Sequence, residues 1–480
     1  MTEPTVARVD AALAGVLPLG SLYAVGGRVR DEVRSESERH PIAVKDLDYV
    51  AVGMALDALI AALGTVGRTD VVGAQFAVVK CTLGGVTVDV ALPRREVSTG
   101  VGHREFQVQS GPDVSLEDDL ARRDFRMNML ARALPSGRLV DPYGGAADIA
   151  ARRIDLLHPA AFVEDPLRML RAAQFAARFA YEVSEAAMKA MRAAAPLAAS
   201  VSPERVREEL AKLLGARRPS IGFEVLRSGG VLGVILPELL AGYGVPQNEW
   251  HAHDVYYHTL ATVDAAPADD LTLRLAALLH DIAKPQTKDG PHFYRHEIVG
   301  EDVARDILTR LRFPRDQIDT VVKLVRGHMY LADPHMTDKT VRRFIQRVGP
   351  ENLERQFDLR AADIAGSGLP KRDDRNERFQ ERVSAILAEH PAISVRDLAV
   401  GGADVVAALR RSGRLTAGSA GGPAVGEILR ALLERVIDDP ALNERTTLLH
   451  EVDRLAADDP PNAGGALHEF HEERNGETGS

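Results

Sequence analysis

Two aspartates spaced two residues apart, Asp46 and Asp48, are the first residues in the chain whose type and spacing could do chemistry. They fall in DLDYVAVG, which reads as a β-strand, and side chains two apart on a strand lie on one face, about 7 Å apart. Carboxylates so placed can bind Mg²⁺, which takes oxygen ligands and keeps positions for water and substrate phosphate. Paired ions held in this way can stabilise the departing pyrophosphate of an in-line displacement.

A glycine turn precedes these aspartates. LYAV reads as a strand, Gly26 and Gly27 end it, and RVRDEVRSESE has helical character. Such a turn leaves backbone N–H groups bare at a helix N-terminus, which suits a triphosphate. Arg28 and Arg30 fall in the first helical turn, where a guanidinium could pair with phosphate oxygens. Each signal alone is typical of an ordinary turn or a solvated strand edge, but together, within one βαβ-sized unit, they predict nucleotidyl transfer.

A third carboxylate, Asp89, interrupts an otherwise apolar strand. We expect strands around 76–83 and 86–91, joined by the glycine pair of a hairpin. A carboxylate in a half-buried strand is costly unless it is paired or metal-bound. We therefore expect Asp89 to be the third acid of the metal site, with pairing to a buried arginine as the alternative.

The stretch 92–119 is polar and glycine-rich and predicts a long loop, of a kind that is usually functional or disordered. The helix expected next, SLEDDLARRDFRMNMLARAL, carries Arg123, Asp124 and Asn128. Asn128 follows Asp124 by four residues, on the same helical face. This cluster could contact ribose and phosphate, and a solvated helix face is the alternative.

A second informative site is FVEDPLRMLRAAQFAARFA. Asp165 followed by Pro166 predicts a helix start with the carboxylate as cap, and Arg168 and Arg171 lie on one face of that helix. A carboxylate only accepts hydrogen bonds and a guanidinium only donates them. Cytosine and adenine present an amino donor beside a ring-nitrogen acceptor, whereas uracil and guanine reverse this pattern. One Asp–Arg pair could thus accept C and A and reject U and G without a template; a capping aspartate with exposed arginines is the alternative.

Histidines and aspartates gather from Trp250 onward. An adjacent His–Asp pair lies on an otherwise apolar helix, and imidazole and carboxylate together suit transition metals. Such a gathering in a helical region is hard to explain without a bound metal. The candidate ligands are His258, His280, Asp281, His296, His328 and Asp363.

The motifs GGRVRD, DLDYVAVG, VDVALPRRE, LARRDFRMNMLA and EDPLRMLRAAQFAARF, in this order, resemble the head and neck of the class II tRNA nucleotidyltransferase (CCA-adding enzyme) and bacterial poly(A) polymerase family over residues 20–240. The resemblance implies a polymerase-β-type head with Mg²⁺ on Asp46 and Asp48. Arg126 and Met129 stand where the family usually has Thr and Ala. The nucleotide-binding residues that the resemblance implies are Gly26, Gly27, Arg30, Asp31, Arg123, Asp124 and Asn128, with base reading by Asp165, Arg168 and Arg171.

The histidine-rich stretch 250–370 resembles an HD-superfamily phosphohydrolase domain, and Lys284 matches the lysine of that family. This resemblance implies a bound transition metal (Ni, Co, Mn or Fe). It also implies phosphomonoesterase or cyclic phosphodiesterase activity that could repair or trim RNA 3′ ends. An inactive fold that braces the tRNA is the alternative.

A basic helical face lies between these two parts, and it could follow the backbone of a tRNA acceptor stem. Because Glu204, Glu208 and Glu209 intervene, a salt-bridged surface is equally compatible. The basic residues are Arg205, Arg207, Lys212, Arg217 and Arg218.

Composition sets limits on these readings. The chain has 480 residues, 45% hydrophobic and 27% charged, which is typical of a soluble protein with about three domains. Its net charge of -10 argues against a general polyanion binder, although the acidic C-terminal tail carries much of that charge. A single cysteine, Cys81, fits a reducing compartment. Since neither a signal peptide nor an apolar run of about 18 residues is found, we expect a cytoplasmic protein without a membrane partner. No obligate protein partner is evident.

The expected fold is a mainly α multidomain chain. A polymerase-β-type α/β nucleotidyltransferase head (1–150) would precede a helical neck for nucleotide selection and tRNA binding (151–245), an HD domain (246–375), a helical C-terminal region (376–457) and a disordered acidic tail (458–480). The expected reaction adds CCA to tRNA from CTP and ATP and releases pyrophosphate. A poly(A) polymerase, a CC-only or A-only enzyme, and an HD phosphohydrolase with an RNA-binding head stay open as alternatives.

Overall fold

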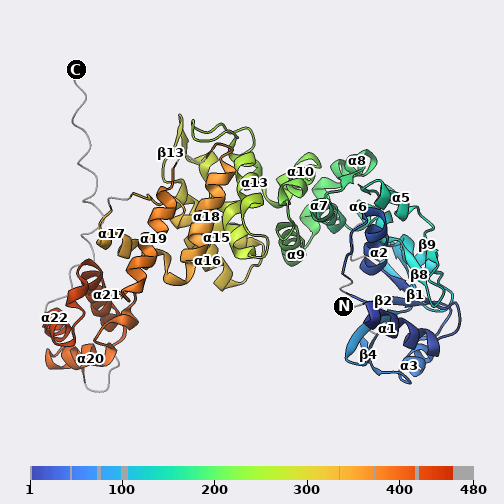
Figure 1. The fold of residues 1–480 in the computed structure, drawn as a ribbon, viewed down its shortest axis with the longest axis horizontal. Coiled ribbons are helices and arrows are strands. Elements are labelled where there is room, and N and C mark those ends of the chain that lie inside the picture. Colours follow the sequence, from blue (N-terminus) through green and yellow to red (C-terminus); the bar gives the residue numbers. More distant parts are fainter. Residues whose placement is uncertain are drawn as a thin grey trace. The chain divides into compact units, whose positions relative to one another are not determined.

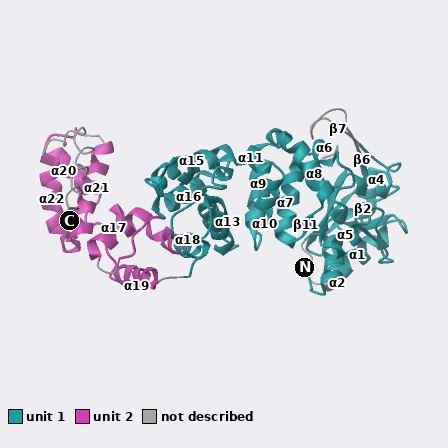
Figure 2. Cartoon of the chain, turned by 90° about the horizontal axis from the view of Figure 1, so that it is seen from above, with its two compact units in different colours: residues 1–328, 358–371 teal, residues 329–357, 372–480 magenta. Residues whose placement is uncertain are grey.

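The computed structural model describes residues 3–43, 46–72, 77–98, 106–333, 336–370, 373–416 and 421–457. The chain forms two compact units (Figure 2). The first is Met1–His328 with Asp358–Lys371, and the second is Met329–Phe357 with Arg372–Ser480. The tail expected to be disordered, 458–480, lies outside the described residues.

A mixed sheet in the order β3-β4-β5-β2-β1-β8-β9 forms the N-terminal part of the first unit (Figure 1). β1 and β2 pair antiparallel, so the predicted strand–helix–strand stretch is not a parallel βαβ unit. β2 and β5 pair in parallel, and their register places Asp48 opposite Asp89. The strands are β1 (Leu22–Val25), β2 (Asp48–Ala51), β3 (Arg68–Val72), β4 (Val78–Leu83), β5 (Val86–Ala91), β8 (Ala131–Ala133) and β9 (Leu139–Val140).

The stretch expected as an unstructured loop instead contains an antiparallel hairpin, β6 (Arg94–Ser98) with β7 (Phe106–Ser110). Residues 99–105 of that stretch are outside the described part. The long helix predicted after it is also wrong. Only α4 (Leu116–Ala121) is helical, a short 3₁₀ turn η2 (Arg126–Asn128) follows, and the chain then enters β8, which pairs with β1. Sheet pairing, which this segment's sequence does not reveal, overrides its helical propensity.

One group of helices packs in the sheet region, and a second group forms the helical neck that follows it in the chain. The helices of the sheet region are α1 (Glu3–Val16), α2 (Gly27–Glu38), α3 (Leu56–Leu63) and α5 (Gly145–Ala150). The neck holds α6 (Ala161–Glu164), α7 (Leu167–Phe179), α8 (Glu185–Ala194), η3 (Ala195–Ser200), α9 (Pro203–Leu214), α10 (Pro219–Ser228), α11 (Leu232–Ile235) and α12 (Pro237–Leu240), with the short strand pair β10 (Arg153–Ile154) and β11 (Glu182–Val183).

Helix α7 is the centre of the neck and is buried on most of its surface. Its small residues Ala172, Ala173 and Ala176 are fully buried and let neighbouring helices approach closely. On α10, a Cβ at Gly222 would lie 2.5 Å from the carbonyl oxygen of Ala173, so only glycine fits there. This packing fixes α7, which carries Arg168 and Arg171 of the predicted base-reading residues, against its neighbours.

The remaining helices of the first unit surround the histidine-rich site. They are α13 (Val255–Ala265), α14 (Leu271–Leu279), η4 (Lys284–Gln286), α15 (His296–Arg310), α16 (Arg315–Gly327) and α18 (Leu353–Gly366), with the hairpin β12 (Lys288–Asp289) and β13 (His292–Phe293). Helix α14 is almost entirely buried from Leu273 to Leu279, as expected for a helix that ends in buried metal-ligand candidates.

The second unit is helical throughout its described residues. Its elements are α17 (Asp338–Val348), η5 (Pro350–Asn352), α19 (Arg375–Ala388), η6 (Val395–Asp397), α20 (Gly402–Arg411), α21 (Gly422–Asp438), η7 (Pro440–Leu442) and α22 (Arg445–Ala457). One apolar cluster joins α20, α21 and α22, and a second joins α17 and α19 around Tyr330. The prediction of a mainly α multidomain chain with an α/β head is confirmed. None of the helices in the described ranges has both the length and the apolar composition of a membrane span.

Candidate active sites

The carboxylates Asp46, Asp48 and Asp89 gather at the adjacent inner strands β2 and β5 of the head sheet. β2 begins at Asp48, so Asp46 lies just before the strand and not on it. Burial, together with the negative charges of Asp89 and Asp46, raises the pKa of Asp48. A carboxylate whose pKa is raised by neighbouring acids is placed to share a cation with them, and carboxylate oxygens are the ligands that Mg²⁺ prefers. The donor set therefore fits a divalent ion.

Asp89 has a partner, but not the buried arginine considered above. The ammonium group of Lys80 lies 2.9 Å from its carboxylate, and both side chains are at least 40% exposed. Such an exposed pair contributes little to folding, about 0–1 kcal/mol. Asp89 can therefore exchange Lys80 for a cation at small cost.

The glycine turn between β1 and α2 lies directly beside Asp48. Gly26 has φ of 74°, and a Cβ there would lie 3.2 Å from Oδ2 of Asp48. A side chain would thus be strained and would enter the space between the turn and the acid. α2 begins at Gly27, so its first amide groups open onto the same space.

The two arginines of the first turn of α2 differ in role. Arg28 is buried and donates to both oxygens of Asp10, at 2.8 and 2.6 Å, and to the Tyr49 hydroxyl at 3.2 Å. Arg30 donates to Oδ1 of Asn128 at 2.9 Å and to Asp31 at 3.0 Å. Arg28 thus joins α2 to α1, whereas Arg30 lines a pocket between the head sheet and the neck.

A pocket of about 320 Å³ lies between the head sheet and the neck. Its volume is in the range of small-molecule sites, about 300–1,000 Å³. Predicted nucleotide-binding residues from three separate stretches of sequence meet in it. The lining residues are Gly26, Gly27, Arg30, Arg122, Arg123, Asp124, Asn128, Asp165, Arg168 and Arg171.

A buried chain of polar contacts forms one wall of this pocket. Arg171 donates to Oδ2 of Asp124 through Nε at 2.8 Å, and Nδ2 of Asn128 donates to Oδ1 of Asp124 at 2.7 Å. Burial would raise the pKa of Asp124, but the charge of Arg171 and the bond from Asn128 outweigh it and lower that pKa. Asp124 and Asn128 do lie together, although the helix that was expected to join them does not form.

Asp165 and Arg168 both line the pocket, and the backbone amide of Arg168 donates to the carbonyl oxygen of Asp165 at 3.0 Å. The N-cap of α7 is Pro166, one residue later than predicted. The carboxylate of Asp165 still accepts from the amide of Leu167, the first residue of the helix, at 3.2 Å, and from Arg205 at 3.2 Å. Arg168 donates to the carbonyl oxygen of Arg122 at 2.6 Å. Arg205 was predicted only as part of a basic face, because its distance from Asp165 in the sequence hides their contact.

A second cavity, of about 490 Å³, shares Gly27, Arg30 and Arg171 with the nucleotide pocket and reaches Asp46 and Asp48. Cations of the neck line its other side, namely Arg178 and Lys212. The two acids thus lie where a negatively charged chain could approach from the second cavity and a nucleotide from the first.

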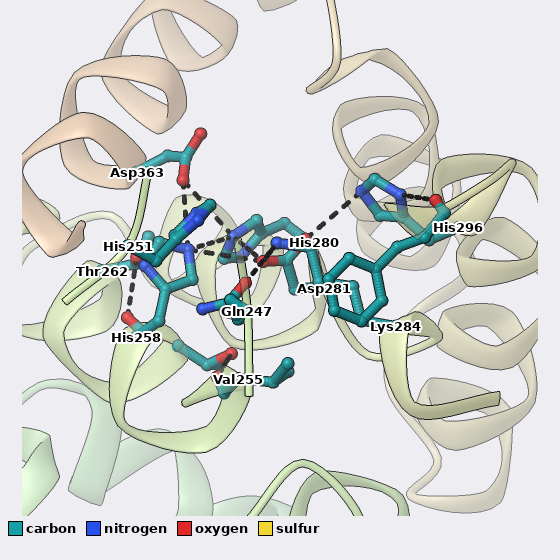
Figure 3. A network of polar contacts seen from close by, with 12 residues as sticks. Gln247, His251, Val255, His258, Thr262, His280, Asp281, Lys284, His296 and Asp363 are labelled. Carbon is teal, nitrogen blue, oxygen red and sulfur yellow. Dashed lines mark hydrogen bonds and ion pairs between the residues drawn. The ribbon is translucent and has the colours of Figure 1, made fainter. Parts of the chain in front are cut away.

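The predicted ligands of the histidine-rich site are all brought together, and most are almost completely buried. Figure 3 labels five of them, His258, His280, Asp281, His296 and Asp363. Oδ2 of Asp281 lies 3.3 Å from Nε2 of His258 and 3.1 Å from Nε2 of His280. Its other oxygen lies 3.4 Å from Nε2 of His296 and 3.6 Å from Nε2 of His328. Asp281 therefore has one pair of imidazoles at each oxygen.

Asp363, from α18, joins the His258 side of this centre, with Oδ1 3.1 Å from Nε2 of His258. Burial disfavours a charged imidazole there, yet Asp281 and Asp363 raise the pKa of His258 to about 9. The two carboxylates thus favour a positive charge at this position, either a protonated imidazole or a bound cation.

The hydrogen bonds of three histidines define which ring nitrogen is available. Nδ1 of His280, His296 and His328 donates to the carbonyl oxygens of Ala277, Phe293 and Val325, at 2.8, 2.7 and 2.7 Å. Each Nε2 then carries a lone pair directed into the centre. This is the arrangement of metal-ligating histidine, whose outer nitrogen is held by a carbonyl or carboxylate. The donor set fits a transition metal on each side of Asp281.

The loop before α13 adds residues that sequence reasoning missed. Gln247 accepts from Nζ of Lys284 at 2.7 Å, and Lys284 contacts Asp281 at 2.6 Å. The ring of His251 packs edge-on against His258 with centroids 4.6 Å apart, and burial lowers the pKa of His251 to about 4. The run HAHDVYYH holds three histidines, His251, His253 and His258. Its spacing does not show that His251 lies at the site together with His258.

Comparison with known proteins gives three family matches, the last of which also includes residues 329–357 of the second unit. Residues 22–155 match the family described as "Poly A polymerase head domain", residues 180–242 the "Probable RNA and SrmB- binding site of polymerase A", and residues 251–365 the "HD domain". The three matches follow the order head, neck and histidine-rich site.

Two similar proteins are both named Multifunctional CCA protein. That of Ralstonia nicotianae is 40% identical over 336 residues, 67% of this chain and 74% of the relative. That of Nitrosococcus oceani is 36% identical over 390 residues, 78% and 92% of the two chains. Among solved structures, the Bacillus stearothermophilus CCA-adding enzyme in complex with CTP is 23% identical, with a TM-score of 0.65 over 95% of this chain and 98% of that one. This likeness shows a shared fold.

Proposed function

The chain belongs to the multifunctional CCA protein family, and from that premise we propose that its head and neck add CCA to the 3′ end of tRNA, using CTP and ATP and releasing pyrophosphate. The observation that carries this proposal is that the cavity lined by Asp46 and Asp48 shares residues, Gly27 among them, with the pocket lined by the glycine turn and the predicted base-reading residues. The names of the relatives favour CCA addition over the poly(A) alternative.

In the proposed reaction, the tRNA 3′ hydroxyl attacks the α-phosphorus of the nucleotide and pyrophosphate leaves. The amide groups at the start of α2 would hold the triphosphate beside Asp48, and Gly26 keeps that approach open. Mg²⁺ held by Asp46 and Asp48, with Asp89 beside them, would supply charge neutralisation at the phosphates and lower the pKa of the attacking hydroxyl. Arg30 and Arg123 would orient the phosphates or ribose from the pocket wall.

Base choice would fall to the opposite side of the pocket. Asp165 presents acceptor oxygens and Arg168 presents donors, as reading of C and A requires. Because Arg205 and the carbonyl of Arg122 hold these two side chains apart, both edges stay available to a base. Arg171 would act through Asp124 and fix the wall behind the base.

Substitutions separate the proposed sites. Asp46→Ala should abolish nucleotide incorporation into tRNA that lacks its 3′ end and leave phosphate-ester hydrolysis intact. His280→Ala should do the reverse. Incorporation by Asp46→Ala at the wild-type rate would contradict the placement of the metal site.

For residues 246–375 we propose a metal-dependent phosphohydrolase that acts on phosphomonoesters or cyclic phosphodiesters at RNA 3′ ends. The supporting observation is the donor set around Asp281, whose available Nε2 lone pairs suit Ni²⁺, Co²⁺, Mn²⁺ or Fe²⁺. Release of phosphate from tRNA ending in a 3′ phosphate or a 2′,3′-cyclic phosphate, compared before and after chelation, tests this activity. Since the substrate is tRNA and the single cysteine fits a reducing compartment, we place both reactions in the cytoplasm.

A further inference from the structure

His251 lies at the edge of the histidine-rich centre and is half-buried, whereas the ligands at its core are almost completely buried. It comes from the loop before α13 and not from the helices that supply the other donors. Figure 3 shows its ring beside His258 and below Asp363. A donor nitrogen of His251 lies within 4.8 Å of donor atoms of both residues.

The hydrogen bonds of His251 determine which ring nitrogen is free. Its Nδ1 lies 3.0 Å from Oδ1 of Asn248. That oxygen also accepts from the backbone amide of Trp250, at 3.2 Å. A backbone N–H can only donate, so the amide of Asn248 presents its oxygen at this point, and Nδ1 of His251 must be the protonated nitrogen. Nε2 therefore carries a lone pair.

The same arrangement holds the three core histidines, whose Nδ1 groups donate to carbonyl oxygens. An outer partner that fixes the ring and leaves Nε2 available is typical of metal-ligating histidine. We propose that His251 is a further metal ligand of this centre, and that it binds the ion on the Asp363 side together with His258. The inference rests on the proposed metal-dependent hydrolase.

His251 would be a third nitrogen donor on this side of the centre, after His258 and His280. A third nitrogen donor would alter which ion binds most tightly there. Imidazole suits later transition metals, whereas Mn²⁺ and Mg²⁺ are better served by oxygen ligands. His251 would therefore favour Co²⁺ or Ni²⁺ over Mn²⁺. The loop that carries it also holds Trp250, the only tryptophan in the chain, so its fluorescence can report ion binding nearby.

The test is a titration of the chelator-treated full chain with Co²⁺, followed by ion stoichiometry, Trp250 fluorescence and the visible absorption of bound Co²⁺. An Asp46→Ala background removes binding at the head. His251→Ala should weaken Co²⁺ binding by about tenfold or more and change the absorption spectrum. It should leave Mn²⁺ binding less affected. His253→Ala is the matched control, because it lies in the same loop, is exposed, and belongs to none of the donor groups among the described residues.

Incorporation into tRNA by His251→Ala in the unaltered head reports whether the variant is folded. If the His251→Ala variant binds Co²⁺ with the wild-type affinity and spectrum, His251 is not a metal ligand, and the proposed hydrolase still stands. If the chain with intact histidines binds no ion, or binds equally well after His280→Ala, the proposed metal centre itself is wrong.

Discussion

Arg171 of the neck and Asp124 of the head form a buried ion pair across one wall of the nucleotide pocket. Nε and Nη2 of Arg171 lie 2.8 and 2.7 Å from the same carboxylate oxygen of Asp124. The other oxygen accepts from Asn128, which in turn accepts from Arg30 on α2. One network therefore fixes the neck helix, the pocket wall and the helix that follows the glycine turn.

Loss of this pair should weaken both folding and catalysis. Arg171→Ala leaves the buried Asp124 carboxylate without its guanidinium, and removal of one partner of a buried pair costs about 3–5 kcal/mol of folding stability. Because about a third of the Arg171 side chain is exposed, we expect a loss at the low end of that range. Incorporation should fall about 100-fold through misplacement of the base. Chemical denaturation and single-turnover kinetics measure the two effects. Arg192→Ala, at an exposed pair on α8, should change neither.

The glycine turn gives a prediction that separates strain from function. Gly26→Ala and Gly20→Ala each place a side chain at positive φ, 74° and 82°, so each should cost about 1–2 kcal/mol of stability. Only at Gly26 would the new Cβ approach Asp48, at 3.2 Å. Gly26→Ala should therefore lose incorporation by about 100-fold, and Gly20→Ala should retain it. Equal losses in the two variants would show that strain, and not the approach to Asp48, is responsible.

The charge of Arg123 should set the acid limb of the pH profile. Asp48 must lose its proton before it can bind a cation, so incorporation falls as the pH drops through its pKa. Burial and Asp89 raise this pKa, whereas Arg123 lowers it. Arg123→Gln should thus raise the pKa further and move the acid limb of kcat/KM toward higher pH. Arg122→Gln should slow the reaction without moving the limb, because Arg122 is not among the charges that shift the pKa of Asp48.

Base selection should depend on Asp165. Asp165→Ala removes the acceptor that would bind the amino groups of C and A. Discrimination of CTP against UTP should then fall by about 100-fold or more. Competition between labelled CTP and UTP during single-nucleotide addition measures this ratio. Arg207→Ala is the control, because this arginine of α9 donates to the carbonyl oxygen of Arg312 and does not line the pocket. An unchanged ratio in Asp165→Ala would remove this residue from base selection.

Local patterns predicted the residues that do chemistry better than the elements that carry them. The spacing of Asp46 and Asp48 and the Asp165–Pro166 helix start depend on neighbouring residues only, and both lead to pocket-lining side chains. The helix expected over 115–134 forms only as α4, and its second half failed because its end pairs with β1, about a hundred residues earlier in the sequence.

Long-range partners account for most of the other differences. Arg126, in place of the usual Thr, pairs with Asp148 and Asp155, which no local pattern indicates. Arg28 was expected at phosphate but pairs with Asp10. The role of His251 depends on where the loop before α13 returns to the site, and the sequence does not distinguish it from His253 in the same loop.

CCA addition is tested most directly by the length of the product formed on three tRNA substrates. The first ends before CCA, the second ends in CC, and the third is complete. Purified protein would receive labelled CTP and ATP, separately and together. We predict addition of C and C with CTP alone, completion to CCA with both, addition of A alone to the CC end, and no extension of complete tRNA. A long A tail, or incorporation that does not stop after CCA, would contradict the proposed function.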